Sequence, residues 1–165
     1  MTDTRGRLNI DAGQGQWNLS GAIDESSALT ELLSRAQGGR LVLDLAGVTF
    51  INSLGVRGWI RMQGEASRQG IAIELRRVAE PIIHQLNMII ATRGTSQVTS
   101  FYAPYACDAC GREESLLIDA TANAAGLANL VAPAMPCPEC AAQMAFNDFP
   151  ERYFSFLVPE TSRSG

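Results

Sequence analysis

The sequence carries little charge. Charged side chains make up 18% of its 165 residues, and the formal net charge is −4; globular chains average about 25% charged residues. Basic residues are scarcest in residues 107–165, which contain only Arg112, Arg152 and Arg163 and no lysine. An acidic chain is repelled by the phosphate backbone of nucleic acids and by anionic membrane surfaces. We therefore expect neither nucleic acid nor a membrane as its partner.

Long hydrophobic runs are also missing. No apolar stretch approaches the roughly 20 residues that span a bilayer, although 46% of the residues are hydrophobic. The first residues, MTDTRGRLNIDAGQG, lack the apolar core of a secretory signal. These absences lead us to expect a cytoplasmic protein. In a reducing compartment, the four cysteines of the chain favour metal binding over disulfides.

Residues typical of catalytic sites are few. The single histidine, His84, falls within a predicted helix, and we interpret it as a structural residue. Asp24 and Glu25 could form an acid–base pair, but a helix cap followed by a first-turn acid explains them better. The sequence shows no nucleophile–base pair and no open metal site. We therefore expect that the chain is not an enzyme.

The cysteines form two CxxC pairs, Cys107-Asp-Ala-Cys110 and Cys137-Pro-Glu-Cys140. A CxxC turn lets both sulfurs face one ion, and two such turns make a closed tetrahedral site that suits Zn²⁺. The segment between the pairs is longer than the roughly 15–20 residues usual for this pattern, and we expect its excess, residues 119–136, to form a loop or short helix. A redox dithiol, an iron–sulfur site and coincidence are the alternatives. We predict one structural zinc ion, held by all four cysteines.

Strands and helices alternate over the first two-thirds of the chain. Alternating or buried apolar patterns predict strands at residues 5–10, 16–19, 40–45, 71–75 and 97–102. Helices are expected to begin at Asp24 and Ser53, and a third is expected over residues 79–91 with Pro81 in its first turn. This order predicts an α/β fold, a mixed and mostly parallel sheet covered by helices.

The character of the sequence changes after the last predicted strand, which we expect Pro104 to end. We place a domain boundary there, between an α/β domain at residues 1–103 and a small zinc-ribbon module at residues 104–165. The module is predicted to end in a helix that packs on the ribbon or bridges to the sheet. Its apolar stripe would consist of Phe149, Tyr153, Phe156 and Leu157. The tail, residues 161–165, is predicted to be disordered.

Ser53 is the candidate regulatory residue. It lies at a predicted turn from strand to helix, where its hydroxyl should be exposed. A phosphate there would add about −1.5 to −2 charges, which the N–H groups of a helix N-terminus tolerate. Serine is also a preferred helix cap, so the sequence leaves two roles open, a cap and a phosphorylation switch.

Three features of residues 5–102 carry a family resemblance: LSGAID at residues 19–24, LVLDLAGVTFINSLGVRGW at residues 41–59, and the order of helices and strands around them. They resemble a STAS domain, the fold of anti-sigma-factor antagonists. The family pattern Asp-Ser-Ser/Thr-Gly-Leu opens a helix, and this chain reads Asn-Ser-Leu-Gly-Val at residues 52–56. In family antagonists the first serine is phosphorylated by a kinase that is itself the anti-sigma factor. The resemblance implies that role for Ser53, although Asn52 and Leu54 depart from the pattern.

Two functional hypotheses follow. The first is a regulatory protein–protein interaction module, resembling anti-sigma-factor antagonists. Its protein partner, by the resemblance a serine kinase or anti-sigma factor, would bind through residues around the turn: Asn52, Ser53, Leu54, Gly55 and Arg57. The alternative is a structural or assembly protein whose zinc ribbon mediates self-association into a homo-oligomer.

Overall fold

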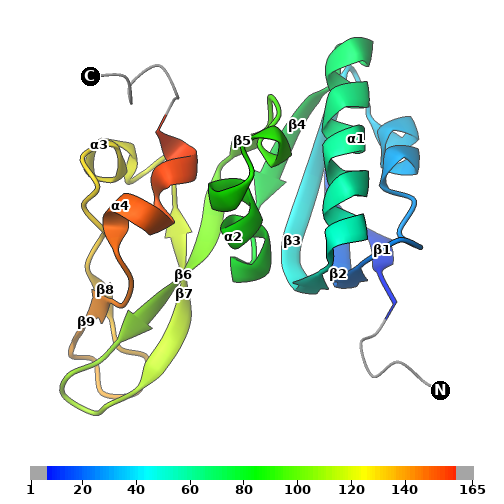
Figure 1. The fold of residues 1–165 in the computed structure, drawn as a ribbon. Helices are drawn as coiled ribbons and strands as arrows, with labels where there is room; N and C mark the ends of the chain where they lie inside the picture. Colours follow the sequence, from blue (N-terminus) through cyan, green and yellow to red (C-terminus); the bar gives the residue numbers. More distant parts are fainter. Residues whose placement is uncertain (1–6, 159–165) are drawn as a thin grey trace.

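The computed structural model describes residues 7–158, which form two β-sheets and several helices (Figure 1). The first sheet has the order β1-β2-β3-β4-β5. Its strands are β1 (Asn9–Ala12), β2 (Trp17–Ile23), β3 (Arg40–Ile51), β4 (Ala72–Arg76) and β5 (Gln97–Val98). The β1–β2 hairpin is antiparallel, and the other three pairs are parallel. The predicted mixed α/β architecture is therefore present.

The second sheet has the order β7-β6-β9-β8 and is antiparallel throughout. Its strands are β6 (Ser100–Ala106), β7 (Glu113–Asp119), β8 (Met135–Pro136) and β9 (Gln143–Phe146). The predicted last strand is thus split between β5 in the first sheet and β6 in the second. Pro104 does not end β6, as we expected, but pairs with Ser115 inside it. The domain boundary that we place near Ala103 falls within this strand and stays a prediction.

Strand β3 runs through the centre of the first sheet. Leu41, Leu43 and Leu45 alternate on one face and are at most 1% exposed, as a buried strand requires. The strand continues well past the predicted residue 45, because its pairing with β2 extends to Ile51. Gly47 permits this close pairing, since a Cβ there would lie 2.6 Å from the Cβ of Ser20.

Helix α1 (Ser53–Gln69) covers one face of this sheet (Figure 1) and begins at the predicted residue. Its buried side includes Val56, Trp59 and Met62, and the Trp59 indole N–H donates to the Thr92 carbonyl at 2.8 Å. Gly70 ends the helix in the left-handed conformation, with φ 70°, which glycine adopts without steric cost.

The helix that we predicted to begin at Asp24 is wrong at its start. Asp24 caps no helix; its carboxylate accepts from the Ser26 N–H at 2.9 Å and from the Ser26 hydroxyl at 2.6 Å. The helical segment is a 3₁₀ helix, η1 (Leu29–Arg35), preceded by Ala28 in the left-handed region. Serine and aspartate side chains here satisfy backbone groups locally and so compete with an α-helix.

Helix α2 (Glu80–Met88) has Pro81 in its first turn, as predicted, and the short 3₁₀ helix η2 (Ile90–Thr92) follows it. Between the cysteine pairs lies the short helix α3 (Ala124–Ala128), whose Leu127 is buried. The chain then reaches α4 (Pro150–Tyr153) and the 3₁₀ helix η3 (Ser155–Leu157). In Figure 1, α2 lies between the two sheets, and it contacts β3, β6 and α4.

The C-terminal helices are bonded to α2 through Asn87. Its amide N–H₂ donates to the Tyr153 carbonyl at 2.8 Å, and its Oδ1 accepts from the Ser155 hydroxyl and the Phe156 N–H. The predicted C-terminal helix is present as the short α4 and η3, which contact α2, but its apolar stripe differs. Phe149 is 70% exposed, while Phe154, which we did not predict, is fully buried.

Within residues 7–158, no helix combines the length and the apolar character that crossing a bilayer requires. The start of the first predicted strand and the predicted disordered tail lie outside these residues.

Candidate metal centre and candidate docking surface

The structure brings the four cysteines together. One pair lies in the turn between β6 and β7, and the other lies in the turn between β8 and β9. All four sulfurs lie within 4.8 Å of one another, with Cys107 Sγ 3.5 Å from Cys140 Sγ and Cys110 Sγ 3.7 Å from Cys137 Sγ. A tetrahedron with metal–sulfur bonds of about 2.3 Å has sulfurs about 3.8 Å apart. The cluster therefore has the dimensions to hold a metal ion.

The two turns share one backbone pattern. In the first, the Cys107 N–H donates to the Arg112 carbonyl, and the Gly111 N–H donates to the Cys107 carbonyl, both at 2.8 Å. The second turn repeats these bonds, at 2.7 and 2.9 Å, with Cys137, Ala142 and Ala141. The residue after the second cysteine is left-handed in both turns, with φ 78° at Gly111 and 62° at Ala141.

The thiols influence one another. The N–H of Cys110 is the main cause that lowers the pKa of Cys107 to about 7. At Cys110 the Arg112 N–H acts in the lowering direction, but burial and hydrogen bonds with neighbouring thiols raise its pKa to about 12. The first turn thus favours deprotonation of Cys107 and disfavours deprotonation of Cys110. A bound cation would offset the cost of deprotonating the second thiol, because it stabilises every thiolate that ligates it.

The arrangement of the cysteines is closed. Cys107 and Cys137 are buried, at 2% and 3% exposed, while Cys110 and Cys140 face outward. Arg112 links the two turns at the surface, because its Nε donates to Glu114 at 2.8 Å and its Nη1 donates to Glu139 at 3.1 Å. A tetrahedral ion bound by all four thiols would have no ligand position open for a substrate. Sequence reasoning missed this role of Arg112.

At the start of α1, Asn52 caps the helix. Its Oδ1 accepts from the Gly55 N–H at 2.7 Å, and its Nδ2 donates to Glu25 Oε2 at 3.1 Å. The cap, one of the two roles that the sequence left open for Ser53, is therefore made by the preceding residue. Ser53 is the first residue of the helix and is exposed.

The remaining predicted docking residues divide by burial. Leu54 is 46% exposed and Arg57 is exposed. Gly55 is buried against β2, where a Cβ would lie 2.4 Å from the Ile23 carbonyl oxygen. Gly55 therefore allows the helix to approach the sheet, and the outward side chains are those of Ser53, Leu54 and Arg57.

A pocket of about 230 Å³ adjoins these residues. Leu54, Arg57 and Arg61 line it, together with Asp24 and Glu25. Both carboxylates already accept hydrogen bonds, from Ser26 and Asn52.

Among the residues that the structure describes, neither Arg57 nor Arg61 has an ion pair. The i, i+4 spacing of Arg57 and Arg61 is visible in the sequence, but such a spacing also occurs on ordinary solvated faces. We call Ser53, Leu54, Arg57 and Arg61 the α1 surface.

A scan of models of known protein families and a search of curated protein sequences both found no match to this chain.

Proposed function

We propose that the chain is a non-enzymatic regulatory module that binds a protein partner through the α1 surface, with its C-terminal part held by a structural zinc ion. The observation that carries the docking proposal is the α1 surface itself. It joins an exposed leucine to two arginines that have no ion pair within residues 7–158. Apolar side chains flanked by arginine are typical of binding surfaces. The resemblance of residues 52–56 to the STAS phosphorylation motif supports the same location.

Zinc is the metal that the donor set favours. Four thiolates in tetrahedral arrangement suit Zn²⁺ or an iron–sulfur centre. The closed geometry and the two short strands that it joins, β8 and β9, fit a structural role, in which the ion replaces a hydrophobic core. Metal analysis of the purified chain should give about one zinc per molecule. An absorbance band in the visible range would instead identify an iron–sulfur centre and would overturn the zinc assignment.

Phosphorylation of Ser53 by a serine kinase is the regulatory step that we propose for the α1 surface. The serine is exposed at the first position of α1. Arg57 lies four residues further along, the spacing at which helical side chains meet. A phosphate on Ser53 would therefore form a charge-assisted pair with Arg57 and withdraw that arginine from the partner.

The test is a photo-crosslinking amino acid placed at Leu54 in the full chain, in cells of the source organism. The matched control is the same substitution at Leu117, which is 41% exposed on β7. We expect Leu54 to yield a cross-link to one other protein, and Arg57→Glu to abolish it, while the Leu117 variant does not capture that protein. A cross-link that Arg57→Glu leaves intact, or none at all, would contradict the docking proposal.

Self-association is the second candidate function. Strand β7 lies at the edge of the second sheet, and an unpaired edge can add a strand from another copy. Sedimentation of the purified chain measures its oligomeric state and so tests this candidate function. A stable dimer that dissociates on Leu117→Lys would favour the scaffold, while a monomer at high concentration would exclude it.

A further inference from the structure

A second pocket, with a volume of about 340 Å³, lies on the first sheet at the start of β3, whereas Ser53 follows the end of that strand. It is formed where the β1–β2 turn, the end of η1 and the start of β3 meet. Its lining includes the glycines of the turn, Trp17 and two arginines, Arg35 and Arg40, but no aspartate or glutamate. We propose that this pocket binds the phosphate group of a small phosphorylated molecule.

Arg35 is held in place but incompletely bonded. Its guanidinium carbon lies 4.5 Å from the centroid of the Trp17 ring, the geometry of a cation–π contact. Its Nη1 is buried and has no hydrogen-bond partner. A buried donor without an acceptor is costly, the more so on a charged group. Arg35 also lines the pocket, so an anionic oxygen there would meet a guanidinium charge that no carboxylate pairs within residues 7–158, and the stacking on Trp17 orients that group before the anion arrives.

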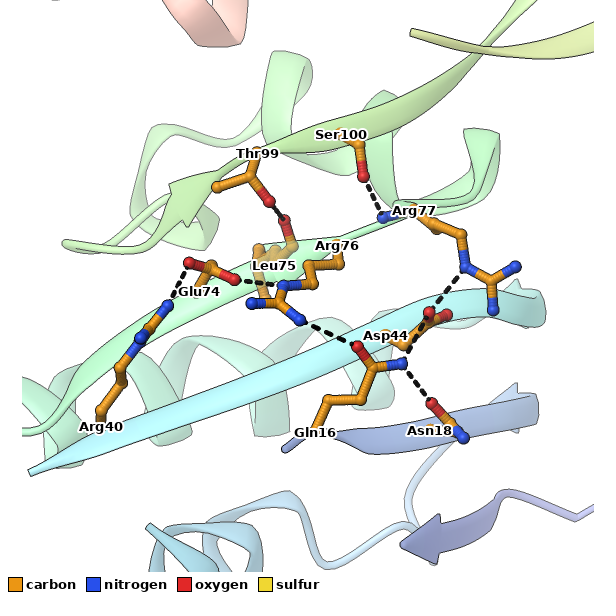
Figure 2. Close-up of polar contacts among 10 residues, drawn as sticks. All are labelled: Gln16, Asn18, Arg40, Asp44, Glu74, Leu75, Arg76, Arg77, Thr99 and Ser100. Carbon is orange, nitrogen blue, oxygen red and sulfur yellow. Dashed lines mark hydrogen bonds and ion pairs between the residues drawn. The ribbon is translucent and has the colours of Figure 1, made fainter. Parts of the chain in front are cut away.

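Arg40 adds a second positive charge to the lining of the pocket, and Figure 2 shows why this charge is not cancelled. Arg40 and Arg76 both bond to the single carboxylate of Glu74. The nearby carboxylate of Asp44 is paired with a third arginine, Arg77, at 2.6 Å. The network therefore carries more guanidinium than carboxylate groups, and Arg35 increases the excess.

The neighbouring Gln16 is already committed. Its Nε2 donates to Asn18 and Asp44, and its Oε1 accepts from Arg76 (Figure 2). Gln16, which lines the pocket, is therefore already bonded within this network and does not compete with the arginines for a ligand. On the β1–β2 turn, Gly15 has open space where a side chain would stand, so a ligand can approach the backbone there.

The charge and size of the pocket select the ligand class. A phosphate monoester carries about −1.5 to −2 charges at pH 7, which matches two guanidinium groups, and its oxygens suit their forked donors. A carboxylate brings one charge only. The volume is at the lower end of the roughly 300–1,000 Å³ of small-molecule sites, which favours a small molecule over a protein segment.

The test is a nuclear magnetic resonance titration of the full chain at constant ionic strength. The two tryptophans provide an internal reference, because Trp17 lines the pocket whereas Trp59 is fully buried on the inner side of α1. With inorganic phosphate or glycerol 3-phosphate, the Trp17 indole signal should shift to saturation while the Trp59 signal stays fixed. Tighter binding of glycerol 3-phosphate would support a site for a phosphate monoester, and tighter binding of inorganic phosphate would contradict that proposal and assign the pocket to the free ion.

Arg35→Gln should weaken binding at least about tenfold, the size of one charge-assisted hydrogen bond. The control is Arg68→Gln, which makes the same charge change on α1 at a residue paired with Glu65 and outside the pocket, and should bind as the unchanged chain does. If Arg35→Gln fails to fold, Arg40→Gln replaces it with the same expected loss. An immobile Trp17 signal, equal binding by the arginine variants, or tighter binding of acetate would overturn the proposal. The α1 surface contributes nothing to this pocket, so the docking proposal is unaffected by the result.

Discussion

Asn52 makes two side-chain hydrogen bonds at the start of α1, one to its own helix and one to Glu25 of the preceding loop. Replacing Asn52 with alanine removes both, and we expect the free energy of unfolding to fall by about 1–2 kcal/mol. Ser53→Ala should change it by less than about 0.5 kcal/mol, as at an ordinary surface position. Urea denaturation of both variants measures the difference. An equal loss of unfolding free energy in Ser53→Ala would show that the serine, and not Asn52, caps the helix.

Ala141 occupies a backbone conformation that suits glycine. Its equivalent in the first cysteine turn, Gly111, has a similar positive φ and open space around it. Left-handed backbone costs a residue with a Cβ about 1–2 kcal/mol. We therefore expect Ala141→Gly to raise the free energy of unfolding of the metal-bound chain by about 0.5–1 kcal/mol and Gly111→Ala to lower it by about 1 kcal/mol. Thermal denaturation with excess metal measures both. A neutral Gly111→Ala would show that the turn adapts.

Sequence alone predicted the cysteine cluster because the CxxC spacing brings two sulfurs to one side of a turn whatever surrounds it. It did not identify the helix cap, because asparagine and serine are both preferred caps. The choice depends on Glu25, which reaches Asn52 from a neighbouring loop. The position of Arg35 over Trp17 could not be predicted from the sequence either, since it depends on how η1 packs against β2.

At the scale of elements, the second cysteine turn connects two very short strands, β8 and β9. Cys137→Ser should release the metal and raise amide exchange in both strands and in α3, while β3 keeps its protection, because few backbone bonds hold this part together without the ion. Glu139→Gln alters the same turn at a residue with no thiol and should keep one metal per chain. Metal analysis and hydrogen exchange measure the two effects. Unchanged exchange in metal-free Cys137→Ser would contradict a structural role for the ion.

The elements with strong periodicity and clear end signals were predictable. Helix α1 ends at Gly70, and α2 begins with Pro81 in its first turn. The incorrect predictions concern strands whose length depends on contacts with residues distant in the sequence. Strand β3 is long because β2 continues to pair with it. Pro104 fits inside β6 because its carbonyl accepts from Asn147 at the end of β9, so its backbone nitrogen, which points the same way, is not needed for pairing with β7.

At the scale of the whole molecule, the buried residues form one cluster that includes Leu43 of the first sheet and Tyr105 and Cys107 of the second. Phe101 is at the junction, with its ring 6.0 Å from that of Phe154 and 5.1 Å from that of Phe156. Separate modules would unfold independently, whereas a shared core predicts that they unfold together. Whether a domain boundary lies near Ala103 therefore depends on whether the two sheets unfold together or separately.

Phe154→Ala tests that question. The side chain is fully buried, contacts Phe101, and is stacked on Phe146 at 4.8 Å, so its loss should lower the free energy of unfolding by about 3–5 kcal/mol. If the core is shared, hydrogen exchange should accelerate by the same factor in β3 and in β9, and unfolding should remain a single transition. Phe149→Ala, at a ring that is 70% exposed, controls for the loss of a phenylalanine beside the same helix and should leave both strands unchanged. Faster exchange in β9 with an unchanged β3 would establish two independent modules and support the boundary near Ala103.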